Sequence, residues 1–306
     1  MTENEEENGK ELKTSIALYV GMGAFIVLTQ VIALMLATPF EVSDIKAFDN
    51  PESMWNPVYF FALIMVFTAF ILIVFKYGGD KFVYFVMLAA VAATIYYVMI
   101  ALDALIYEFI AGVSEQAYTM LQVLRPYSIL PLVLTLILTL LLYKYPEWYV
   151  LDATGVIIAG GAAAIFGISL GIVPVLLLMI ILAVYDAISV YKTKHMVTLA
   201  ESVIDLHVPI LFVLPRDRKF SLLKNSELED AFFMGLGDAI IPTILVVSAF
   251  MKYANTTPAL GAMIGTLVGY AALTRLAGRG TPHAGLPFLN SGAIIGFVIG
   301  YVVMIA

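Results

Sequence analysis

Long apolar runs separated by short polar segments dominate the 306-residue chain. A helix needs roughly 20 mostly apolar residues to cross the hydrocarbon core of a bilayer. Seven runs come close to or exceed this length with at most one charge each, at 14–40, 57–75, 82–102, 126–143, 231–251, 253–274 and 284–306. The pattern therefore predicts a mainly helical protein that crosses a membrane several times.

One further stretch is too long for a single span. Residues 153–185 hold 33 positions without a charge, and Gly171 and Pro174 lie near their middle. Glycine and proline mark a tight connection, and proline favours the first turn of the helix that follows. We therefore predict two spans here, 153–170 and 173–191, and nine in total.

The basic residues give an orientation. With nine spans and a cytoplasmic N-terminus, 13 of the 16 lysines and arginines fall in cytoplasmic segments and 3 fall outside. This matches the usual excess of basic residues on the cytoplasmic side. A single span at 153–191 would move the basic loop at 192–230 outside and largely cancel the bias. We expect an all-α polytopic protein with nine transmembrane helices, a cytoplasmic N-terminus and the C-terminus outside.

These boundaries divide the chain into four parts. We expect residues 1–13 to form a disordered acidic tail, 14–191 to form helices one to six, 192–230 to form a cytoplasmic loop, and 231–306 to form helices seven to nine. The tail lacks the basic region of a signal peptide, so we expect the first span to be retained.

Composition supports a membrane protein and removes several chemistries. Hydrophobic residues make up 62% and charged residues 13%, whereas soluble domains average about 45–50% and about 25%. The chain has no cysteine, which excludes disulfides, thiolate metal sites and cysteine nucleophiles. The three histidines lack metal-ligand spacing. We expect no cofactor, no metal and no nucleic-acid partner.

Two carboxylates lie inside predicted spans, Asp186 in the sixth and Asp238 in the seventh. Charged side chains in hydrocarbon are costly and commonly functional. At about 1.5 Å per residue, both lie roughly 8–11 Å below the cytoplasmic surface. The two spans are consecutive and antiparallel, so these side chains can face each other.

Facing carboxylates in a low dielectric cannot both ionise, so such a pair shares a proton. The ionised member can take a proton from water while the protonated member donates to a scissile carbonyl oxygen. Gly235 and Gly237 leave room beside Asp238 and weaken the start of its helix. The residues alone leave three readings open: catalysis, ion-coupled transport and a structural role.

The motifs around both aspartates resemble a known family. Tyr185-Asp186 on one span and Gly235-Leu236-Gly237-Asp238 on the next resemble the YD and GxGD signatures of intramembrane aspartyl proteases, the presenilins and signal peptide peptidases. The third signature of that family is a Pro-Ala-Leu motif that opens the ninth span. Here Ala284-Gly285-Leu286-Pro287 matches the latter half of the presenilin form. A literal Pro-Ala-Leu at 258–260 lies across the membrane from the pair and is not assigned to the site.

The resemblance implies an aspartic endopeptidase that hydrolyses peptide bonds within transmembrane segments, using two aspartates and an activated water. The implied site consists of the catalytic pair Asp186 and Asp238, the supporting residues Tyr185, Gly235, Leu236 and Gly237, and the substrate-cleft residues Leu286 and Pro287. It ranks hydrolysis above the alternative, an ion- or proton-coupled transporter or cation leak pathway that uses the same aspartates.

Orientation separates the branches of the family. Signal peptide peptidases are inverted relative to presenilins, and a cytoplasmic 192–230 loop makes this chain resemble a presenilin. It lacks the large cytoplasmic extensions of eukaryotic presenilins, so it resembles a prokaryotic, archaeal homologue in the cell membrane. The expected partners are the lipid bilayer and single-span transmembrane substrates, without obligatory accessory subunits. A homo-oligomer is left open.

Residues 208–215 form an apolar segment inside the basic loop and are too short to span. In presenilins this region helps to hold the substrate and can pair with it as a strand. One reading is therefore a short interfacial segment over the active site that gates substrate entry, and the other is a membrane-surface anchor without a gating role.

Glycines recur every four residues in the last two predicted spans, a spacing that places them on one helix face. They are Gly261, Gly265 and Gly269 in one span and Gly292, Gly296 and Gly300 in the other. This pattern predicts close packing of helices.

Overall fold

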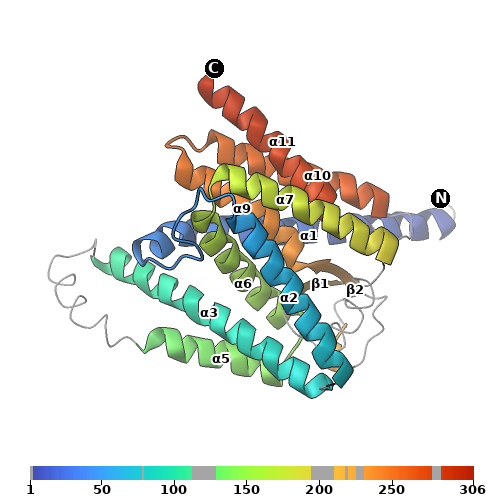
Figure 1. Cartoon of the computed structure of the whole chain (residues 1–306). Helices are drawn as coiled ribbons and strands as arrows, with labels where there is room; N and C mark the ends of the chain where they lie inside the picture. The colour runs from blue at the N-terminus through green and yellow to red at the C-terminus, as the bar shows by residue number, and fades with distance from the viewer. Residues whose placement is uncertain are drawn as a thin grey trace.

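A computed structural model describes residues 3–77, 79–111, 129–193, 210–217, 220–224, 231–277 and 284–306. Within these residues helices dominate, which confirms the mainly helical class (Figure 1). The α-helices are α1 Glu3–Val42, α2 Asn56–Tyr77, α3 Asp80–Ala111, α5 Leu130–Lys144, α6 Trp148–Ser169, α7 Ile172–Ile188, α9 Leu236–Lys252, α10 Thr257–Ala277 and α11 Leu286–Ile305. Short π and 3-10 turns follow at Ser189–Thr193 and Leu222–Lys224.

Seven of these helices are long and apolar enough to cross a membrane, namely α1, α2, α3, α6, α7, α10 and α11. Helices α5 and α9 have 15 and 17 residues, fewer than the roughly 20 that a perpendicular span needs. Each described α-helix overlaps one predicted span. Which ends face the cytoplasm stays a prediction.

Three of the segments that the predicted orientation places outside lie together, namely those that follow α1, α6 and α9. The Ala47 N–H of the α1–α2 connection donates to Ser169 Oγ at the end of α6, at 2.7 Å. Lys252 at the end of α9 forms an ion pair with Glu52 in the same connection. The ends of α1, α6 and α9 therefore meet, as the alternation of antiparallel spans requires.

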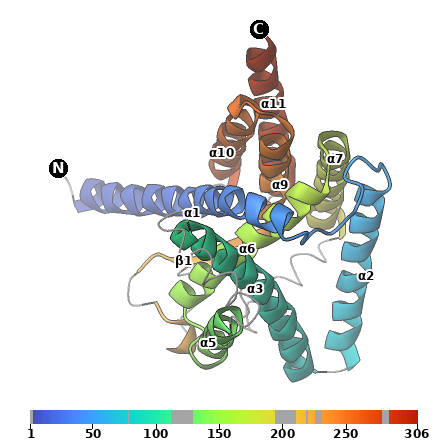
Figure 2. The same cartoon turned by 90° about the vertical axis from the view of Figure 1, so that its left-hand side faces the viewer.

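Helix α6 is the most enclosed of the seven long helices. It packs against α1, α3 and α9, and Figure 2 shows it with α1 on one side and α3 on the other. Small residues make this possible, because Gly167 approaches Val247 of α9 so closely that a Cβ would overlap it. The buried helix α6 thus forms a fixed support for α9.

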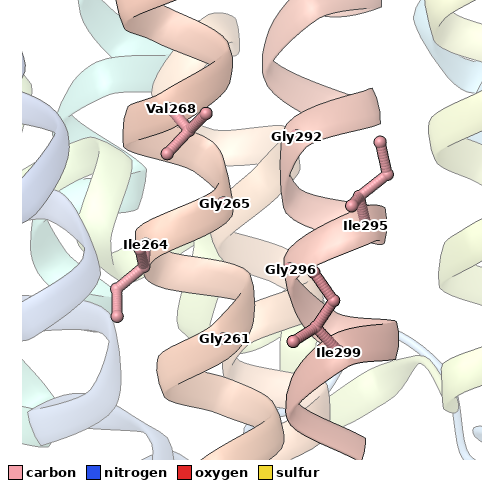
Figure 3. A pocket seen from close by; sticks show the side chains of 8 residues that line it. All are labelled: Gly261, Ile264, Gly265, Val268, Gly292, Ile295, Gly296 and Ile299. Atoms are coloured by element: carbon pink, nitrogen blue, oxygen red, sulfur yellow. The ribbon is translucent and has the colours of Figure 1, made fainter. Parts of the chain in front are cut away.

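Helices α10 and α11 pack along their glycines, which confirms the predicted close contact (Figure 3). A Cβ on Gly265 would overlap the carbonyl oxygen of Gly292, and one on Gly261 would overlap that of Gly296. Isoleucine and valine side chains flank these glycines around an apolar groove of about 300 Å³. Contact between the two backbones therefore sets the position of α11.

A two-stranded sheet differs from the all-helical expectation. Strand β1, Leu211–Pro215, pairs antiparallel with β2, Ala231–Gly235, with Phe212 opposite Met234. Helix α9 accordingly begins at Leu236, not at residue 231. Both strands are apolar on both faces, and hydrophobicity alone does not distinguish such a strand from a helix. The strand β1 occupies most of the predicted 208–215 segment.

Candidate active site

Asp186 lies in the last turn of α7, just before the π turn at Ser189–Thr193. It is 8% exposed, and its Oδ2 accepts the N–H of Leu286 at 3.1 Å. Leu286 is the first residue of α11. The predicted substrate-cleft motif thus supplies a backbone N–H that orients the carboxyl of Asp186. Such a hydrogen bond stabilises a carboxylate.

Asp238 occupies the first turn of α9, which Gly235 precedes in an extended conformation. Gly237 is exposed and Asp238 is partly exposed. The partial positive charge at a helix N-terminus favours a carboxylate at this position. The second predicted catalytic carboxyl therefore lies at the start of α9, beside Gly285.

Gly285 connects the two carboxyls. A Cβ on Gly285 would lie 2.8 Å from Oδ1 of Asp238, while the N–H of the next residue, Leu286, binds Asp186. The structure therefore brings both aspartates and the start of α11 together around one dipeptide of backbone.

The supporting residues predicted from the sequence have separate surroundings. The ring of Tyr185 packs edge-on against Phe61 of α2, with ring centroids 5.7 Å apart. Leu236 is 5% exposed and belongs to the core, and its N–H donates to the carbonyl oxygen of Ile210 at 3.1 Å. Pro287 occupies the first turn of α11, where proline is favoured.

Three residues that contact the site or the β1–β2 sheet beside it were not predicted from the sequence. Gly285 was noted only as a departure from the family motif. Tyr191 lies in the π turn, and its hydroxyl accepts the N–H of Ala284 at 3.3 Å. Asp152 on α6 is 2% exposed and accepts a backbone N–H of β1. Asp152 immediately precedes the uncharged run at 153–185, so it reads as a flanking residue.

Metal ligands do not gather in the described parts of the chain, which contain no cluster of three or more histidine, cysteine or acidic residues. The predictions about His195, His207 and His283 fall outside the described residues. The chemistry available at the described site is that of carboxyls, backbone amides and water.

Comparison with known proteins identifies the family. The family profile described as "Signal-peptide peptidase, presenilin aspartyl protease" matches residues 23–306. A solved structure of a presenilin family intramembrane aspartate protease in space group C222 has a TM-score of 0.68 and 36% identity, and the alignment covers 93% of this chain and 99% of that one. A second, in space group P2, has a TM-score of 0.65 and 38% identity, with coverage of 92% and 97%. A search of curated proteins finds no match.

The profile match extends over most of the chain, and both solved structures share its fold over nearly their full length. The long apolar helices agree with the membrane location of these relatives. The chain therefore belongs to the signal-peptide peptidase and presenilin family and is a multi-pass membrane protein with aspartic endopeptidase activity.

Proposed function

We propose that Asp186 and Asp238 act together as a water-activating pair that hydrolyses peptide bonds within transmembrane segments of single-span membrane proteins. The observation that carries the proposal is the contact of both carboxyls with Gly285-Leu286. Two carboxyls held against the same short piece of backbone can act on the water and on the carbonyl of one scissile bond.

The reaction needs one proton shared between the carboxyls. The ionised carboxylate takes a proton from water, whose oxygen attacks the carbonyl carbon, while the protonated carboxyl donates to the carbonyl oxygen. The resulting diol collapses, the C–N bond breaks, and the amine leaves with a proton from the pair. The products are a carboxylic acid and an amine, and no bond forms between substrate and enzyme.

Water must reach the pair inside an apolar protein. Asp186 is 8% exposed, whereas Asp238 is partly exposed beside the exposed Gly237. We therefore expect water to reach the pair past Gly237 in the first turn of α9. In the predicted orientation this side faces the cytoplasm, which would supply the water.

Strand β2 offers a way to hold an unwound substrate. In an antiparallel ladder, opposite residues form hydrogen-bonded and non-hydrogen-bonded pairs in alternation. Leu236 and Ile210 form a hydrogen-bonded pair, so Phe233 belongs to a non-hydrogen-bonded pair, and its N–H and C=O point away from β1. A substrate strand could join this edge, which satisfies backbone groups that would otherwise be unpaired in the membrane. Asp238 follows the end of β2 by three residues, so the added strand would pass the pair.

The proposal is tested with the purified protein and a single-span substrate in proteoliposomes. We expect two fragments whose masses together exceed that of the substrate by one water. A peptide mimic that carries a hydroxyl at the scissile carbon should compete with the substrate, because it resembles the diol. Ion flux through the same vesicles without fragment formation would overturn the proposal in favour of transport.

A further inference from the structure

Asp152 is a buried acidic residue outside the pair, and the proposed reaction does not use it. It lies in the second turn of α6 and is 2% exposed. Its Oδ1 accepts the N–H of Val213 in β1 at 2.7 Å, and its Oδ2 has no hydrogen-bond partner among the described residues. Burial of a carboxylate with one oxygen unpaired costs free energy. We therefore ask what the bond from Val213 to Asp152 contributes in return.

The bond occupies a particular edge of the sheet. The same alternation that turns Phe233 away from β1 turns the N–H of its partner, Val213, away from β2. This N–H lies on the outer edge of β1 and would need another acceptor. Pro215, two residues further along the same edge, has no N–H. Asp152 therefore caps the outer edge of β1 with a side chain from α6.

Side-chain packing holds β1 against the same helices. Phe212 lies over Gly155 of α6, where an added Cβ would be 3.3 Å from its ring. It also stacks on Phe25 of α1, with ring centroids 5.0 Å apart. Leu214 fills the space that Gly21 leaves on α1. Apolar contacts of this kind are tolerant of small shifts, whereas one hydrogen bond to a rigid helix fixes the position of the strand along that helix.

A second acid on α6 extends this attachment. Glu147, the residue before α6, accepts the hydroxyl of Ser221 at 2.6 Å and the N–H of Leu222 at 3.2 Å. Both partners lie in the connection that leaves β1. The start of α6 thus holds β1 at Asp152 and the following segment at Glu147.

The position of β1 determines the position of Asp238 through β2. β1 pairs with β2 along its length, and β2 ends at Gly235, directly before α9. The Leu236 N–H closes the ladder on Ile210. A shift of β1 along α6 would therefore move the first turn of α9, which carries Asp238, against Asp186 on α7.

We propose that Asp152 is a positioning residue that sets the geometry of the pair by hydrogen-bonding Val213, thereby holding the β1–β2 hairpin and the Asp238 turn in register with α6. It also covers the edge of β1 and leaves the edge of β2 for a substrate strand. This inference rests on the proposed function of the pair.

The test compares Asp152→Leu with Asp152→Asn in the full-length protein. Both keep the branched arrangement of four side-chain heavy atoms, but only asparagine keeps an oxygen that can accept the Val213 N–H. We expect Asp152→Leu to lower kcat per folded enzyme about tenfold or more, the scale of a lost charged hydrogen bond. Its cleavage positions should spread over neighbouring bonds in mass spectra, and Asp152→Asn should restore both properties to within about threefold.

Hydrogen exchange of the peptide that contains β1 provides a readout that needs no substrate. Exchange should be faster in Asp152→Leu than in wild type and near wild type in Asp152→Asn. Thr154→Val is the matched control, because its buried hydroxyl bonds only within α6 and its loss should leave cleavage unchanged. Should Asp152→Leu not fold, Val213→Pro removes the donor instead and should show the same exchange and cleavage changes.

Wild-type rates and unchanged cleavage positions in folded Asp152→Leu would overturn the inference. So would an asparagine variant as impaired as the leucine variant, because the acceptor would then be irrelevant. If wild type itself does not cleave, the proposed function fails, and the exchange measurement still decides whether Asp152 holds β1.

Discussion

At the scale of single residues, the start of α11 determines the site as much as the aspartates do. Leu286 donates its N–H to Asp186, and Gly285 lies so near Asp238 that a Cβ would touch the carboxyl. Of the side chains recognised from sequence signatures, the two aspartates both lie against Gly285-Leu286. The contribution of Gly285 could not be predicted, because it depends on the distance between two helices and no side-chain type signals it.

Substitution of Gly285 should be graded by size. A Cβ would lie 2.8 Å from Asp238 Oδ1, and that carboxyl can rotate slightly to admit one methyl group, the alanine of the family motif. Gly285→Ala should therefore cleave within about threefold of wild type, whereas the branched side chain of Gly285→Val should cost about tenfold or more, as overpacking usually costs 1–3 kcal/mol. Initial cleavage rates at equal folded protein measure this. Equal rates for valine and wild type would contradict the proposed contact.

At the scale of secondary-structure elements, the β1–β2 hairpin is the feature that differs from the predicted helices. β1 and β2 turn what reads as one helical run at 231–251 into a strand followed by a short helix. The periodicity was ambiguous because both faces of β2 are apolar, and its pairing partner lies across a polar loop. Sequence reasoning located the apolar segment of that loop but could not supply its strand register, which depends on the packing of β1 against α6 and α1.

The outer edge of β2 can be tested at Phe233. Phe233→Pro removes an N–H that faces away from β1, so the ladder of the hairpin keeps its bonds. If substrate pairs along this edge, cleavage should fall about tenfold, the scale of one lost hydrogen bond at a binding edge. Phe233→Ala removes the ring and keeps the N–H, so it controls for the side chain. A proline variant that cleaves like the alanine variant would show that substrate does not use this bond.

The contact between α10 and α11 gives another prediction at this scale. A Cβ on Gly265 would overlap the backbone of Gly292, so Gly265→Ala must push α11 outward and with it the residues that touch both aspartates. We expect a lower melting temperature and slower cleavage, since overpacking costs about 1–3 kcal/mol. Ala272→Val adds volume at an exposed position of the same helix and should change neither. Wild-type behaviour of Gly265→Ala would mean that the helices do not approach so closely.

For the whole molecule, the positions of the helices were the most predictable feature. Long charge-free runs mark them directly, and the split of 153–191 matches the separate helices α6 and α7. The role of Asp152, by contrast, could not be predicted, because a charge at the end of an apolar run is interpreted only as the boundary of a span. Its role became visible only when folding brought residue 213 beside residue 152.

The predicted orientation can be checked because the chain has no cysteine. Asp49→Cys places a thiol on a connection predicted to be outside, and Leu223→Cys places one on an exposed position of the predicted cytoplasmic loop. In intact cells a membrane-impermeant thiol reagent should label the first variant only. Both should react after permeabilisation. The opposite labelling would invert the topology and align the chain with the signal peptide peptidase orientation.

The central claim is that Asp186 and Asp238 form one catalytic unit. The most direct measurement is the cleavage rate of a single-span substrate by wild type, Asp186→Asn, Asp238→Asn and the double variant. Asp103→Asn serves as the control, because Asp103 is a buried acid on α3. Residues that act as a unit are not additive, so each single variant should fall to the rate of the double variant while Asp103→Asn stays active. Substantial cleavage by either single variant would contradict the account.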